Sequence, residues 1–155
     1  MTSRLIVVTV GVCLSVLLQA QASTSFSGNW TLNVSKSQNL GMMASMQDTV
    51  SIEQTATVLT IRDRALFQGQ ESTRITRIEL SGKPAVNAGP MGEPNETVAK
   101  WTGGKLVVTW TAEGAVAGTR VVRKETRSLS ADGKTMTVES VRENTASIVM
   151  VYDKR

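Results

Sequence analysis

The residues that could carry chemistry gather in the segment 119–129, where charged and apolar side chains alternate. Arg123, Glu125 and Arg127 occupy every second position between Val121 and Leu129. Residues two apart in a strand point to the same face, so these five side chains share one face. Two guanidiniums beside a carboxylate suit the carboxylate or phosphate of an amphipathic ligand. The segment therefore predicts a partly hydrated, positively charged binding site, provided that this face points inward.

The opposite orientation of this segment remains open from the sequence. The second face carries Val122, Lys124, Thr126 and Ser128, so neither face is purely apolar. Burying unpaired charge is costly, and inward charges would need partners or water. In the alternative orientation the arginines and Glu125 lie outside the fold, in solvent.

Three further side chains are candidate ligand contacts. Arg74 shares the parity of Ile78 and Leu80 in the segment 72–80, so it could join the other arginines. Trp101 and Trp110 lie in the two arms of an expected hairpin, where they line an apolar pocket or form ordinary core. The candidate ligand-binding residues are Arg74, Trp101, Trp110, Arg123, Glu125 and Arg127.

Composition excludes several kinds of site. The 155 residues contain no histidine and one cysteine, Cys13, which rules out histidine-dependent triads and histidine-ligated zinc. The acidic residues show no diagnostic spacing, so we expect no catalytic residue, no metal and no cofactor. A formal net charge of +4 with few aromatic residues argues against a nucleic-acid partner.

The elements that position these residues are short β-strands. Segments rich in Val, Ile and Thr recur, divided by Gly, Asp, Asn and Pro. The connections are mostly short, which favours an all-β, antiparallel up-and-down barrel of about eight to nine strands over a sandwich. Residues 35–47, with three methionines, form a loop or a helical turn over the barrel mouth. Residues 84–95 contain all three prolines and are the least regular segment after residue 22.

The N-terminal residues 1–22 have the three parts of a secretory signal peptide. Arg4 is followed by the apolar run Leu5–Leu18 and by Ala20-Gln21-Ala22, a small-x-small cleavage site. The run is shorter than a bilayer span requires. We therefore expect a periplasmic or secreted protein without a membrane anchor, in which residues 23–155 form one barrel domain.

Four pieces of the sequence, in order, carry a family resemblance: 26–32 (Phe-Ser-Gly-Asn-Trp-Thr-Leu), 101–103 (Trp-Thr-Gly), 129–135 (Leu-Ser-Ala-Asp-Gly-Lys-Thr) and 151–154 (Val-Tyr-Asp-Lys). The set resembles small exported lipocalin-like (calycin-type) β-barrel proteins, mostly of unknown function. The resemblance implies that Trp30 plugs one end of the barrel and stacks on an arginine of a late strand. Arg123 and Arg127 are the expected partners.

The main functional expectation is non-catalytic binding of a small hydrophobic or amphipathic molecule inside the barrel. An alternative is a protein-interaction or inhibitor module whose partner is an envelope protein. The least favoured alternative is an enzyme that uses a carboxylate of the barrel lumen, such as Glu125.

Overall fold

The computed structural model describes residues 24–89 and 92–155. The predicted signal peptide, residues 1–22, lies outside the described residues. Within the described ranges, no helix has the length and apolar character needed to cross a membrane.

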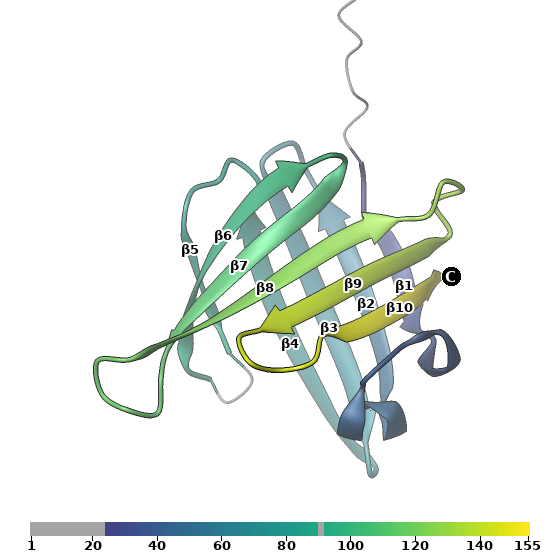
Figure 1. Ribbon diagram of the computed structural model, residues 1–155. Coiled ribbons are helices and arrows are strands. Elements are labelled where there is room, and N and C mark those ends of the chain that lie inside the picture. The colour runs from purple at the N-terminus through teal and green to yellow at the C-terminus, as the bar shows by residue number, and fades with distance from the viewer. Residues whose placement is uncertain (1–23, 90–91) are drawn as a thin grey trace, which may run out of the picture.

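Ten antiparallel strands follow one another along the chain in a single meander (Figure 1). Each strand is hydrogen-bonded to the next, except β4 to β5, and β1 also pairs with β10. The strands are β1 (Gly28–Leu32), β2 (Gln47–Gln54), β3 (Val58–Phe67), β4 (Gln70–Glu79), β5 (Ala85–Ala88), β6 (Pro94–Thr102), β7 (Lys105–Glu113), β8 (Arg120–Leu129), β9 (Thr135–Arg142) and β10 (Ile148–Lys154). The expected up-and-down barrel is confirmed.

The structure has ten strands, whereas eight or nine were expected. The additional strand is β5, which was not predicted. This strand has four residues and lies within the irregular segment 84–95. Pro84 precedes it directly, and Pro94 opens the next strand. Prolines remove backbone donors and normally mark strand ends, so they masked a short edge strand between them.

The sheet is interrupted between β4 and β5, and one side chain bridges the gap. Asn87 Oδ1 accepts a hydrogen bond from the Arg77 amide, and Asn87 Nδ2 donates to the Arg77 carbonyl, both at 2.8 Å. Nδ2 also donates to Thr97 Oγ1 at 2.9 Å. The amide thus takes the place of one backbone pair in the missing ladder and holds the two sheet edges together.

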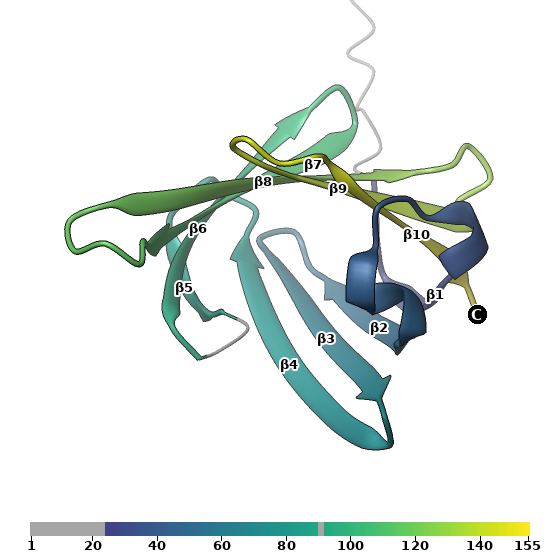
Figure 2. The same cartoon turned by 60° about the horizontal axis from the view of Figure 1, so that its bottom comes forward.

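Two short 3-10 helices, η1 (Val34–Lys36) and η2 (Gly41–Ser45), connect β1 to β2. They lie between β10 and β2 at one end of the barrel (Figure 2). Leu40 is 7% exposed and anchors this segment, whereas Met42 is 82% exposed. The segment expected to be a loop or a helical turn therefore contains two such turns.

The opposite end of the barrel is a packed apolar plug, which we call the packed end. Phe26 and Trp30 are fully buried there, and Trp30 Nε1 donates to the Phe26 carbonyl at 2.9 Å. Phe26 also stacks on Trp101, with ring centroids 6.0 Å apart. Leu59, Ile78, Leu106 and Met136 complete the packing. Trp30 therefore belongs to the core, as the family resemblance implies.

The cation beside Trp30 differs from the expected one. Lys154 Nζ lies 5.2 Å from the ring centroid, whereas Arg123 stacks on Trp110 instead. The reason is barrel closure, since the β1–β10 pairing sets Lys154 directly opposite Trp30. Gly28 lies against this lysine: its φ of +137° favours glycine, and a Cβ there would lie 2.9 Å from Lys154 Cε, so the lysine side chain would have to shift.

Candidate functional site

Strand β8 presents its charged face to the barrel interior. Glu125 and Arg127 are buried, with side chains 6% and 10% exposed. Glu125 Oε1 pairs with Arg123 at 3.2 Å, and Glu125 Oε2 pairs with Arg127, also at 3.2 Å. Of the two orientations left open by the sequence, the structure has the one that places these charges inside. The cost of burying Glu125 is offset because each of its oxygens faces a guanidinium.

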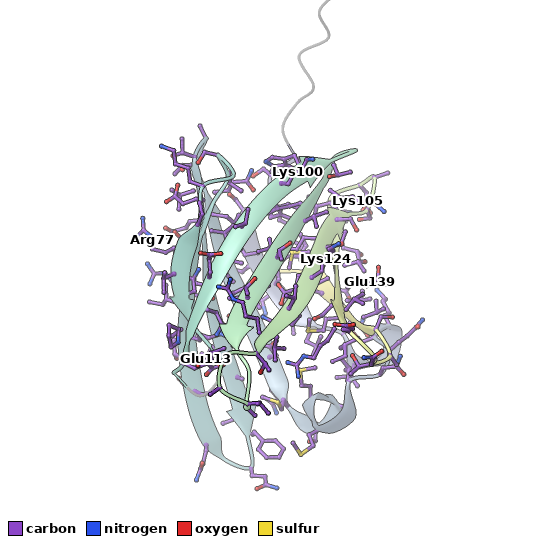
Figure 3. All side chains as sticks on the ribbon, turned by 60° about the vertical axis from the view of Figure 1, so that its left-hand side comes forward. Arg77, Lys100, Lys105, Glu113, Lys124 and Glu139 are labelled. Atoms are coloured by element: carbon purple, nitrogen blue, oxygen red, sulfur yellow. The ribbon has the colours of Figure 1, made fainter. Side chains whose placement is uncertain are left out.

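The outer face of the same strands is charged and exposed. Lys100, Lys105, Glu113, Lys124 and Glu139 are all exposed, and Figure 3 labels them on the outside of β6 to β9. The interior charges are thus not an extension of a polar surface. In β7 and β9 they lie beside the buried Val108 and Val138, and the buried Ser140 of β9 is directly opposite Glu125.

Trp110 is attached to this group through Arg123. The two residues are direct cross-strand partners, and the Arg123 guanidinium carbon lies 4.8 Å from the Trp110 ring centroid. Such a contact contributes roughly 0.5–2 kcal/mol and fixes the arginine over the ring. Trp110 is 7% exposed, so its indole N–H points into the protein rather than into solvent.

The opposite wall of the barrel adds a second polar group, from β2, β3, β4 and β10. The Tyr152 hydroxyl donates to Asp48 Oδ2 at 2.9 Å. Arg74 Nη2 pairs with Asp63 Oδ2 at 3.4 Å, and these two side chains are 43% and 23% exposed. Together with Trp110, Arg123, Glu125 and Arg127 they form what we call the interior polar cluster: Asp48, Asp63, Arg74, Trp110, Arg123, Glu125, Arg127 and Tyr152.

The pKa values of Asp48 and Tyr152 are shifted by burial and by charges from both walls of the barrel. Burial raises the pKa of the Asp48 carboxyl, the Tyr152 hydrogen bond lowers it, and the nearby charge of Asp63 raises it further. Burial also raises the pKa of Tyr152 well above its ordinary value, and the charge of Asp48 adds to this effect, while Arg127 opposes it. Tyr152 therefore stays protonated at physiological pH and acts as a hydrogen-bond donor.

Among the described residues, three buried side-chain atoms have no hydrogen-bond partner: Asp48 Oδ1, Trp110 Nε1 and Arg127 Nε. All three belong to the interior polar cluster. An unpaired buried polar atom costs about 1–3 kcal/mol, so three in one cluster are unlike an ordinary core. Two are N–H donors and one is a carboxyl oxygen, so the cluster contains hydrogen-bonding capacity that no other side chain uses.

The exposure of inward-facing residues rises away from the packed end. Leu59 and Ile61 of β3 are buried, the next inward residues Asp63, Ala65 and Phe67 are half-buried, and Arg74 of β4 is exposed. The barrel end that carries the β3–β4 turn is therefore the open one. The cluster lies between this open end and the packed end.

Two surface grooves lie outside the interior polar cluster. One, of about 460 Å³, includes Val86, Glu96 and Arg120 on the outer side of β5 to β8. The other, of about 350 Å³, lies beside the turns of the packed end at Gly104 and Ser130. Neither groove includes a residue of the cluster, in which Arg74 and Arg123 are the side chains most exposed to solvent.

Four of the six predicted contacts fall in one half of the interior cluster. Trp110, Arg123, Glu125 and Arg127 lie on β7 and β8, whereas Arg74 of β4 pairs with Asp63 of β3. Trp101 is not part of the cluster, because its stacking on Phe26 assigns it to the packed end. Asp48, Asp63 and Tyr152 were missed by the sequence analysis. Their signal was the parity that Asp48 shares with Val50 and Ile52, and Asp63 with Leu59 and Ile61.

Within residues 24–89 and 92–155, no group of His, Cys, Asp or Glu side chains is arranged to hold a metal ion. The three acids of the cluster are instead engaged by arginines or by Tyr152.

No family model matches this chain, and no curated protein matches it. Solved structures share its fold. The REP1-NXSQ fatty acid transporter aligns with a TM-score of 0.64 at 15% identity, over 83% of this chain and 95% of that one. A Schistosoma mansoni fatty acid binding protein in complex with arachidonic acid gives 0.62 at 17%, over 86% and 98%. Human cRBP IV gives 0.61 at 17%, over 85% and 99%. At these identities the likeness shows the fold alone.

Proposed function

We propose that this protein binds one small hydrophobic or amphipathic molecule inside its barrel, without transforming it. The observation that carries the proposal is the set of three unpartnered buried atoms, Asp48 Oδ1, Trp110 Nε1 and Arg127 Nε. A polar group of a bound molecule can satisfy them, while its apolar part lies along the inward side chains of the open half.

The fold supports the proposal. A barrel of this size can hold one small ligand in its interior. The solved structures with the same fold include a fatty acid transporter and a fatty acid binding protein in complex with arachidonic acid, and these are binding and transport proteins rather than enzymes. The open end and the half-buried Phe67 give an apolar chain a place to lie.

The cluster chemistry favours binding over catalysis. Both oxygens of Glu125 are held in ion pairs, which is the setting of a structural counter-ion rather than of a free base. Asp48 accepts a hydrogen bond from a tyrosine that stays protonated. The signal-like residues 1–22 lead us to place this binding activity in the periplasm or the medium.

Native mass spectrometry tests the proposal directly. Purified protein is incubated with a mixture of long-chain fatty acids, alcohols and monoacylglycerols, passed through gel filtration and weighed. We expect one bound lipid per chain. Ala65→Trp, which fills the interior at the open end, should abolish the adduct. Leu66→Trp, which adds the same ring to the outer face of the same strand, should keep it. A protein that carries no lipid, or an Ala65→Trp variant that carries as much as the parent, contradicts the proposal.

A further inference from the structure

The charges of the interior polar cluster are balanced. Arg74, Arg123 and Arg127 face Asp48, Asp63 and Glu125, so three basic groups meet three acidic ones. The sequence predicts an excess of positive charge, because Glu125 is the one acid that shares a strand face with Arg123 and Arg127. Arg74 is exposed, as is Arg142, which lies directly opposite Arg123 in the sheet, so the side chains that are at least half-buried comprise two arginines and three acids.

The balance is tightest where the cluster is most buried. Arg127 is the deepest guanidinium, and Glu125 already pairs with it. The Tyr152 hydroxyl donates a hydrogen bond to the Asp48 carboxyl, and the charge of Arg127 lowers the pKa of Tyr152 while that of Asp48 raises it. Asp48 therefore lies in the same charged region as the pair of Glu125 and Arg127. An anionic ligand bound here would lie near the carboxylates of Glu125 and Asp48, and the nearest guanidinium, that of Arg127, is already paired with Glu125. In a region of low dielectric, like charges within a few ångströms repel strongly.

A single ligand group that satisfied all three unpartnered atoms would have to both accept and donate hydrogen bonds. Trp110 Nε1 and Arg127 Nε are donors, and Asp48 Oδ1 is a carboxyl oxygen that can accept. A hydroxyl has one donor and two acceptor lone pairs, which matches this inventory in number. A primary amide likewise offers both kinds of group. A carboxylate only accepts, and it would leave Asp48 Oδ1 unpaired.

We infer that the ligand bound in the interior has an uncharged hydroxyl or primary amide at its polar end, and that the cluster discriminates against a carboxylate. This inference rests on the proposed function, since it names the class of molecule that the same site takes. The acids that accompany the arginines disfavour an anionic ligand. The unpartnered atoms of Trp110, Arg127 and Asp48 favour a ligand group that both donates and accepts hydrogen bonds.

Three probes with the same alkyl chain test it: dodecanol, dodecanamide and dodecanoate. Each displaces the uncharged dye N-phenyl-naphthylamine from the full chain at about pH 8, where dodecanoate is ionised. We expect dodecanol and dodecanamide to bind at least about tenfold more tightly than dodecanoate. Equal or tighter binding of dodecanoate overturns the inference and leaves the proposed function standing. If neither the dye nor any probe binds, the proposed function itself fails.

Removing one buried negative charge should shift the preference. In Glu125→Gln, dodecanoate should gain about tenfold in affinity relative to dodecanol, because Arg123 and Arg127 lose their counter-ion. Glu53→Gln, at an exposed position of β2, is the matched control and should leave the ratio unchanged. If Glu125→Gln does not fold, Asp48→Asn removes the half-buried Asp48 carboxyl and should move the ratio in the same direction. An unchanged ratio in a folded variant contradicts the inference.

Discussion

The two halves of the barrel interior are built from the same strands and the same inward alternation, yet they differ in chemistry. At the packed end, Phe26 and Trp30 are fully buried, and the indole N–H of Trp30 has a carbonyl partner. Toward the open end, Glu125 and Arg127 are nearly as buried, but polar atoms beside them have no partner. Burial at the packed end is stabilised by apolar contacts, whereas buried donors and acceptors toward the open end are left without hydrogen bonds. The packed end therefore stabilises the fold, and the open half is the region in which we propose that a ligand binds.

The largest expected effect is at the packed end. Trp30→Ala removes a fully buried side chain and leaves a cavity, so the free energy of unfolding should fall by about 3–5 kcal/mol. Urea denaturation followed by circular dichroism measures the loss. A loss below about 1 kcal/mol would show that Trp30 is not the centre of the packed end.

A smaller loss is expected from the polar half. Arg127→Met removes the guanidinium that pairs with Glu125 Oε2, and the remaining contact with Arg123 limits the cost to roughly 1–3 kcal/mol. The control is Arg123→Met, which changes a more exposed side chain and should cost less. Urea midpoints of the two variants compare them. If Arg123→Met costs more than Arg127→Met, the order of burial assigned to this cluster is wrong.

The smallest effect concerns the pH dependence of stability. Because burial raises the pKa of Asp48 in the folded state, the folded protein binds a proton that the unfolded chain has already lost. This group therefore lowers stability as pH rises from the ordinary carboxyl pKa through the raised folded value. Asp48→Asn keeps an acceptor for Tyr152 and removes the titration, so it should be more stable than the parent above that window and equal below it. Urea titrations across the acidic range measure this difference, and a variant less stable above the window contradicts it.

The sequence predicted the architecture and one wall of the cluster, for identifiable reasons. Period-two alternation reveals which residues share a face, and it grouped Arg123, Glu125 and Arg127 correctly. It does not reveal which wall faces which, because that depends on register and barrel closure. The pairing of Trp30 with Lys154 follows from the closure between the first and last strands, which no local pattern encodes. Asp48 and Asp63 carried a readable signal, because both continue an apolar alternation.

The most direct test of the account compares the indole N–H groups of Trp30 and Trp110 by heteronuclear NMR. Trp30 Nε1 donates to a backbone carbonyl of the packed end, whereas Trp110 Nε1 has no partner. Trp110→Phe assigns its resonance. On saturation with dodecanol, the account predicts a large shift of the Trp110 signal and little change for Trp30. A Trp110 signal that stays in place while a ligand binds, or a Trp30 signal that moves instead, would contradict the assignment of the open half as the binding site.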